Sequence, residues 1–157
     1  MGTSRKSGGA RRVRRRAADA PAAISQQAER HKRTRAAHSD EIKEDYVELI
    51  AQLIGETGEA RTVDLAARLG VSHVTVTKTI ARLQRDGLVQ SAPYRSIFLT
   101  GQGSELAKRS SQRHALVVAF LRKLGVNDRD AESDAEGIEH HLSEATLDAM
   151  TRFIDRP

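Results

Sequence analysis

The first strong signal in the chain is an apolar stripe with helical spacing. It begins a few residues after Asp40 and repeats at positions i, i+3, i+4, i+7 and i+8. Its members are Tyr46, Leu49, Ile50, Leu53 and Ile54. This spacing places the side chains on one face of a helix. The pattern therefore predicts a helix that starts near Asp40 and ends near Gly55 and Gly58.

Residues 60–89 show the pattern of two short helices separated by a glycine turn. Gly70 can adopt the positive φ that a tight turn needs, and Ser72 is suited to cap the second helix. The apolar side of that helix repeats at i, i+4 and i+7, in Val76, Ile80 and Leu83. This order of elements predicts a helix-turn-helix.

A β-hairpin is predicted directly after the helix-turn-helix. Its strands are Leu88–Gln90 and Ile97–Leu99, and residues 92–96 form the tip. A hairpin in this position is a wing. Thr100 is placed to cap a following long helix, which is expected to stop near Gly125.

The last part of the chain is strongly acidic. Residues 128–148 contain eight Asp or Glu and one Arg, in a pattern that indicates two short helices broken near Ser143. The fold class predicted for the whole chain is mainly α with a small β-hairpin wing: a winged helix-turn-helix domain over residues 40–101, then an all-α domain over residues 102–157.

Composition narrows the chemistry. Aromatic residues make up only 3% of the chain, so the core must be aliphatic. The absence of cysteine excludes disulfides, thiolate zinc sites and iron–sulfur clusters. No apolar run approaches the roughly 20 residues that cross a bilayer, and no secretory signal is evident. We therefore expect a cytoplasmic protein without a membrane partner.

The net charge of +5 hides an asymmetry. Residues 1–39 contain 11 Lys or Arg and two Asp or Glu. The rest of the chain contains 15 Lys or Arg and 19 Asp or Glu. With little apolar content, residues 1–39 are predicted to be mostly a disordered basic extension. Such an arm can bind phosphates by releasing counterions. The alternative is a solvated tail without a specific role.

The free face of the second helix in the helix-turn-helix is polar and basic. Hydroxyl, imidazole and cationic side chains there could read base edges in a major groove or bind phosphates. The candidates are Ser72, His73, Thr75, Thr77, Lys78 and Arg82, with Tyr94 and Arg95 on the wing. Taken alone, such a face is also typical of an ordinary solvated helix, but the ordered series of elements favours operator double-stranded DNA as a partner.

The acidic segment contains a candidate metal site. Glu136, Glu139 and His140 lie at i, i+3 and i+4, so they share one side of a helical turn. A solvated acidic helix would show the same pattern. Further donors are Asp45 and Glu48 on the first helix and His114 on the long helix. Four carboxylates and two imidazoles would suit two neighbouring hard cations such as Mn²⁺.

Four segments of the chain resemble the manganese-responsive branch of the diphtheria-toxin-repressor-like (DtxR/MntR) family of metal-dependent repressors. They are EDYVELI (44–50), VSHVTVTKTIARLQRDGLV (71–89), RHALVVAFLRKLGV (113–126) and DAEGIEHHLS (134–143). The resemblance spans roughly residues 38–155. It implies a homodimer that binds operator DNA when Mn²⁺ is bound and represses manganese uptake genes, and a dimerisation role for residues 102–157.

The resemblance also implies that the three segments with metal donors meet in space. The family's ligands correspond to Asp45, Glu48, His114, Glu136, Glu139 and His140, for about two ions per subunit. Iron-dependent relatives carry Met at the position of Asp45 and Cys at that of Glu136, so the oxygen donors here favour manganese. His141 does not correspond to a ligand.

Three other functions remain open at this stage. An iron-responsive repressor would share the fold, and a metal-independent winged-helix repressor would use the acidic segment only structurally. A two-metal hydrolase could also use carboxylate and histidine pairs to activate water. It would need a substrate cleft and a further base, and no motif indicates them. We therefore expect a regulator without enzymatic activity or an organic substrate.

Overall fold

The opening helix is much longer than its apolar stripe predicts. In this computed structural model, which describes residues 8–91 and 96–156, helix α1 runs over Gly8–Thr57. The prediction of disorder before residue 40 thus differs from the structure, where residues 8–38 are helical. Their high content of Ala and Arg, both strong helix formers, accounts for this. Residues 1–38 and 39–157 form separate units, and the second unit is described below.

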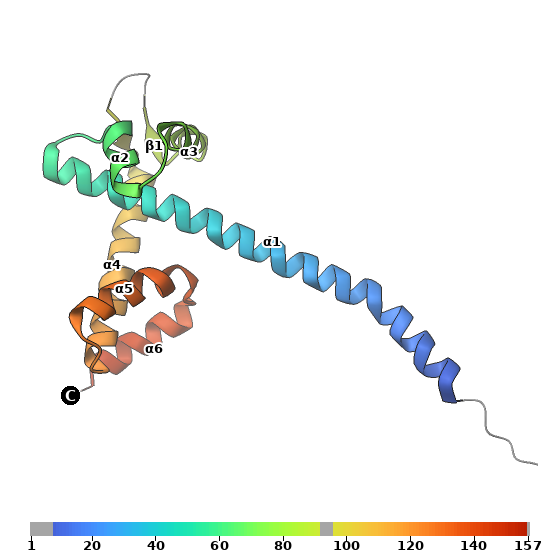
Figure 1. Cartoon of the computed structure of the whole chain (residues 1–157). Helices are drawn as coiled ribbons and strands as arrows, with labels where there is room; N and C mark the ends of the chain where they lie inside the picture. The colour runs from blue at the N-terminus through green and yellow to red at the C-terminus, as the bar shows by residue number, and fades with distance from the viewer. Residues whose placement is uncertain (1–7, 92–95, 157) are drawn as a thin grey trace, which may run out of the picture. The chain divides into compact units, whose positions relative to one another are not determined.

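The winged helix-turn-helix forms as the sequence predicts (Figure 1). Helix α2 spans Thr62–Leu69 and helix α3 spans His73–Arg85. Gly70 between them has a φ of 64°, and Ser72 caps α3 by accepting a hydrogen bond from the Thr75 amide at 3.1 Å. Local sequence therefore sets the direction in which α3 leaves the turn.

The wing is a short antiparallel hairpin. Strands β1 (Val89–Gln90) and β2 (Phe98–Leu99) pair with Val89 opposite Leu99. An isolated bridge between Ala60 and Ile97 attaches the second strand to the loop before α2. Residues 92–95, most of the predicted tip, lie outside the described residues. A largely aliphatic core holds these elements together, and its most buried members include Ile50, Leu65, Val76, Leu83 and Ile97.

The helical half follows directly from the wing. Helix α4 spans Gly101–Lys123 and helix α5 spans Asp128–Ile138. A 3-10 turn, η1, covers Glu139–His141, and helix α6 spans Glu144–Ile154. A second core forms between α4, α5 and α6, from Val117, Val118, Ala131, Ala135 and Met150. No helix in the described part of the chain is long and apolar enough to cross a membrane.

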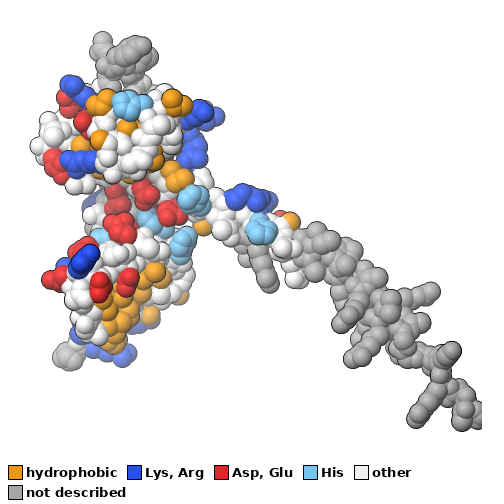
Figure 2. Space-filling model, viewed as in Figure 1, with side chains coloured by type: hydrophobic (Ala, Val, Ile, Leu, Met, Phe, Trp, Pro, Cys, Tyr) orange, Lys and Arg blue, Asp and Glu red, His pale blue; other side chains and the backbone are white. Residues whose placement is uncertain are grey.

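Polar side chains occupy the region between the two apolar cores. Figure 2 shows acidic and histidine side chains gathered where the winged-helix half (residues 39–100) meets the helical half (residues 101–156). The residues come from the C-terminal part of α1, the middle of α4, and α5 with η1. The fold thus brings together segments that are far apart in the sequence.

Candidate metal centre and DNA-binding face

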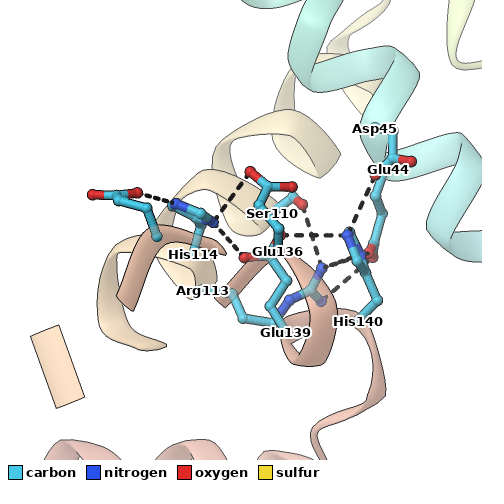
Figure 3. Close-up of polar contacts among 9 residues, drawn as sticks. Glu44, Asp45, Ser110, Arg113, His114, Glu136, Glu139 and His140 are labelled. Atoms are coloured by element: carbon cyan, nitrogen blue, oxygen red, sulfur yellow. Dashed lines mark hydrogen bonds and ion pairs between the residues drawn. The ribbon is translucent and has the colours of Figure 1, made fainter. Parts of the chain in front are cut away.

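His140 lies at the centre of the polar cluster, with its side chain only 4% exposed. Its Nε2 atom is 3.3 Å from Asp45 Oδ1 and 3.4 Å from Glu139 Oε1. The other ring nitrogen, Nδ1, is 2.7 Å from Glu44 Oε2 (Figure 3). The imidazole is therefore held between helix α1 and its own turn η1.

The second imidazole, His114 on α4, lies on the other side of Glu139. Its Nδ1 is 2.6 Å from Glu139 Oε2 and 3.8 Å from Glu136 Oε1. Its Nε2 is 3.0 Å from Glu132 Oε2. Burial lowers the pKa of His114, but hydrogen bonds with Glu132 and Glu139 outweigh it, and the pKa is raised. The Glu139 side chain is only 1% exposed, and its two oxygens reach both rings.

The carboxylates of α1 complete the cluster. Burial raises the pKa of Asp45, and nearby carboxylates, among them Glu136 and Glu139, raise it further against the opposing effect of His140. Burial likewise raises the pKa of Glu48, with Glu136 and Glu139 adding to the effect and a hydrogen bond with Ser110 opposing it. All six residues singled out in the sequence thus lie within one electrostatically coupled group.

Sequence reasoning missed three charged members of this group. Glu44 contacts His140, Arg113 pairs with Glu44, and Glu132 contacts His114. Glu44 and Arg113 each directly precede a predicted ligand in the sequence. This adjacency was the signal that could have identified them. Their pairings join residues 69 and 96 positions apart, so spacing within one helix could not reveal them.

The free face of α3 has the exposed polar side chains that a recognition helix requires. Ser72, His73, Thr75, Thr77 and Lys78 are all exposed. Arg82, on the same helix, is partly buried, and its Nε is among the described buried atoms without a hydrogen-bond partner. Tyr94 and Arg95 lie outside the described residues.

Two family models together match most of residues 40–157. The N-terminal DNA-binding domain of iron-dependent repressors matches residues 40–97, and the metal-binding and dimerisation domain of the same proteins matches residues 100–157. The chain belongs to the iron-dependent repressor family. This confirms the resemblance to the DtxR/MntR family and the predicted fold class.

Similar proteins in this family are regulators of transcription. The transcriptional regulator MntR of Escherichia coli O6:H1 is 50% identical over 133 residues, which are 85% of this chain and 86% of that protein. The HTH-type transcriptional regulator MntR of Bacillus subtilis is 43% identical over 111 residues, 71% of this chain and 78% of that protein. The chain is thus a DNA-binding transcriptional regulator and not an enzyme.

Solved structures give the same result for the fold. A manganese-dependent transcriptional repressor in complex with manganese aligns with a TM-score of 0.66 at 28% identity, over 73% of this chain and 53% of that one. The manganese regulator SloR aligns with a TM-score of 0.63 at 26% identity, over 73% and 54%. The chain spans about half the length of these two structures.

The donor set of this repressor-family chain fits a hard divalent cation. Among the side chains that the structure describes, no group of three His, Asp or Glu is already spaced to hold a metal ion. Crowded carboxylates nevertheless raise each other's pKa, and a cation would relieve that repulsion. A pocket lined in part by Glu48, His114 and Glu136 adjoins the group and provides access.

The crowding of carboxylates leads us to expect that removing the charge of Glu48 stabilises the metal-free protein. A carboxyl whose pKa is raised on folding destabilises the fold once it is ionised, and this cost appears as pH rises through the folded pKa. Glu48→Gln keeps the size of the side chain and the hydrogen bond with Ser110 but removes the charge. In metal-free protein at pH 7 we expect its melting temperature to rise by about 2–4 °C, the effect of ~1 kcal/mol at this size.

Thermal unfolding followed by circular dichroism at pH 7 and at pH 4 measures this effect. The gain should shrink at pH 4, where wild-type Glu48 is largely protonated. Glu56→Gln is the matched control, since Glu56 lies on the same helix but Arg68 lowers its pKa. The control should be neutral or slightly destabilised at pH 7. An equal response of the two variants would contradict the prediction.

Proposed function

We propose that this chain is a Mn²⁺-responsive repressor of manganese uptake genes, acting as a cytoplasmic homodimer on operator DNA. The observation that carries the proposal is the convergence of six predicted ligands from α1, α4 and α5–η1 on one group. Within it, His140 Nε2 lies 3.3 Å from Asp45 and His114 Nδ1 lies 2.6 Å from Glu139. The similar manganese regulators support the choice of metal.

The donor chemistry also supports manganese. The proposed ligands are Asp45, Glu48, His114, Glu136, Glu139 and His140, and the set contains no thiolate or thioether. Carboxylates with a minority of imidazoles suit Mn²⁺ better than soft metals. Four carboxylates can balance two divalent ions, so we propose about two ions per subunit. A bound cation would supply the positive charge that these carboxylates lack.

The switch follows from where the ligands lie. Asp45 and Glu48 belong to the winged-helix half, whereas the other four ligands belong to the helical half. A cation bound by both halves favours the arrangements in which they are close. In a homodimer this would restrict the spacing of two recognition helices to about 34–36 Å or a multiple, one helical turn of DNA. Coupling of this kind is typically about 1–3 kcal/mol.

DNA recognition is proposed for the exposed face of α3. Ser72, His73, Thr75, Thr77 and Lys78 would contact base edges and phosphates, with Arg82 at the margin. Tyr94 and Arg95 would add wing contacts. The base of the wing is attached to the segment just before α2. The contacts are the bridge between Ala60 and Ile97 and the 2.6 Å hydrogen bond from Ser96 to Glu59. The wing would therefore move together with α3.

The decisive test compares operator binding with and without metal. A duplex is first enriched from a random library by the full-length protein in Mn²⁺, and its affinity is then measured by fluorescence anisotropy. We expect Mn²⁺ to tighten binding about 5- to 150-fold over chelator-treated protein, the range of a coupling of 1–3 kcal/mol. Fe²⁺ and Zn²⁺ at equal free concentrations test the choice of metal, and Mg²⁺ serves as the control. Equal affinity with and without Mn²⁺ would contradict the proposed switch.

A further inference from the structure

Glu44 lies behind His140, on the side away from the predicted ligands. His140 Nδ1 is 2.7 Å from Glu44 Oε2, while Nε2 faces Asp45 at 3.3 Å and Glu139 at 3.4 Å. An imidazole can direct only one of its nitrogens toward a given cation. In this arrangement Nε2 is the nitrogen that faces the oxygen donors, as Figure 3 shows.

Arg113 holds the Glu44 carboxylate from the other side. Its guanidinium engages both carboxylate oxygens, Nη2 with Oε2 and Nη1 with Oε1 at 3.4 Å. The same Nη2 donates to Ser110 Oγ at 3.3 Å. The Glu44 and Arg113 side chains are 17% and 19% exposed. Glu44 is therefore fully engaged with a cation of the protein itself and is poorly placed to serve as a metal ligand.

The hydrogen-bonding roles fix the tautomer of His140. Arg113 Nη2 lies 3.4 Å from His140 Nδ1, which is longer than the 2.7 Å contact with Glu44. A carboxylate can only accept a hydrogen bond and a guanidinium can only donate one. A bare lone pair on Nδ1 would face the Glu44 oxygen and repel it. Nδ1 is therefore the nitrogen that donates a proton to Glu44. When Nε2 binds a cation through its lone pair, the proton of the ring stays on Nδ1.

We propose that Glu44 is a positioning residue that holds His140 as the Nδ1–H tautomer, so that Nε2 is free to bind the regulatory cation. Arg113 pairs with the Glu44 carboxylate and holds it turned away from the metal. A carboxylate behind a histidine ligand fixes the orientation of the ring and strengthens it as a donor, and its loss typically weakens metal affinity about 10- to 100-fold. The proposal rests on the metal-sensing function proposed above.

The chain provides a closely matched control. Arg68 and Glu56 form an ion pair with the same pattern, Nη2 with Oε2 and Nη1 with Oε1 at 3.4 Å. Glu56 lies on the same helix as Glu44, and no described contact joins it to an imidazole. A variant at Glu56 therefore removes the same charge and the same type of ion pair without touching a histidine. A purely structural role for Glu44 would make the two sites behave alike.

The first measurement is the affinity for Mn²⁺ by isothermal titration, with the full-length protein. Glu44→Ala should bind Mn²⁺ about 10- to 100-fold more weakly than wild type. Glu44→Gln should lose less, because the amide oxygen still accepts from Nδ1–H. Glu56→Ala should stay within about twofold of wild type. If Glu44→Ala does not fold, as judged by circular dichroism, Glu44→Gln carries the test, with Glu56→Gln as its control.

The second measurement needs no metal. ¹⁵N NMR of the histidine side chains at pH 7.5 distinguishes the tautomers, and the His140 signals are assigned by their loss in His140→Gln. We expect Nδ1–H in wild type and Glu56→Ala, and a shift toward Nε2–H in Glu44→Ala. An unchanged tautomer, or an unchanged Mn²⁺ affinity in Glu44→Ala, would overturn the role of Glu44. Failure of wild type to bind Mn²⁺ would instead overturn the proposed sensor, whatever the tautomer.

Discussion

Glu139→Gln is expected to eliminate the Mn²⁺ response of DNA binding while the protein remains folded. Glu139 connects the two imidazoles, with Oε2 2.6 Å from His114 Nδ1 and Oε1 3.4 Å from His140 Nε2. Glutamine keeps the shape of this buried side chain but replaces one donor oxygen with an NH₂ group, which cannot bind a cation. It also removes one of the four negative charges that would balance the metal.

The expected size of the effect follows from these losses. Loss of a buried, charged ligand should weaken Mn²⁺ binding by more than the roughly 10- to 100-fold typical of an outer-shell partner. At Mn²⁺ concentrations that saturate wild type, the variant should then bind the operator duplex only as tightly as chelator-treated wild type does. Fluorescence anisotropy measures the DNA affinity, and isothermal titration measures the metal affinity.

The neighbouring histidines provide the controls for this experiment. His141→Ala removes an exposed ring next to the proposed site and should leave the Mn²⁺ response intact. His140→Ala removes a nearly buried ring that faces Asp45 and Glu139, and should behave like Glu139→Gln. A normal Mn²⁺ response in Glu139→Gln would show that the group is not the sensor. If the variant binds DNA more weakly than metal-free wild type does, the substitution has damaged the fold instead.

The elements with local signals could be predicted well from the sequence. The helix caps at Ser72 and Thr100 are confirmed, since each accepts a hydrogen bond from an amide three residues ahead. The break predicted near Ser143 is also present, and Ser143 caps α6 in the same way. Gly70 adopts the expected positive φ. These features depend on a few neighbouring residues, which the sequence displays directly. Local patterns could not predict that metal donors far apart in the sequence meet in space. That expectation came from the resemblance to a known family.

The partners of the proposed ligands could not be predicted. The contacts of Glu44 with Arg113 and His140 depend on how α1, α4 and η1 pack, and no local periodicity encodes that packing. The start of α1 was also missed, because the apolar stripe marks only the part of the helix that packs on the core. Upstream of Asp40 the sequence has no such stripe, and helix propensity is the signal that remains there.

Gly103 provides a second large effect, on stability. It lies in the first turn of α4, where the helix passes close to the start of the wing. A Cβ atom at this position would be 2.0 Å from the carbonyl oxygen of Leu88 and 3.2 Å from Leu99 Cδ2. Leu88 O already accepts from the Thr100 amide at 3.0 Å. The carbonyl therefore cannot move aside without loss of the contact that joins the wing to the capped start of α4.

Gly103→Ala should consequently destabilise the protein despite the better helix propensity of alanine. Overpacking typically costs about 1–3 kcal/mol, and a clash with backbone belongs at the upper end. Alanine recovers roughly 0.5–1 kcal/mol of helix propensity. We expect a net loss of about 2 kcal/mol, or a decrease of roughly 4–8 °C in melting temperature at this chain length. Urea and thermal unfolding followed by circular dichroism measure both quantities.

Gly101→Ala tests whether the clash is the cause. Gly101 lies on the same helix two residues earlier, and a Cβ atom there would meet nothing within 4 Å. This variant should match or slightly exceed wild-type stability. Similar stabilities for the two variants would refute the close approach at Gly103. Because α4 also carries His114 and Arg113, a shift of its first turn should weaken Mn²⁺ binding in Gly103→Ala as well, whereas Gly101→Ala should bind Mn²⁺ normally.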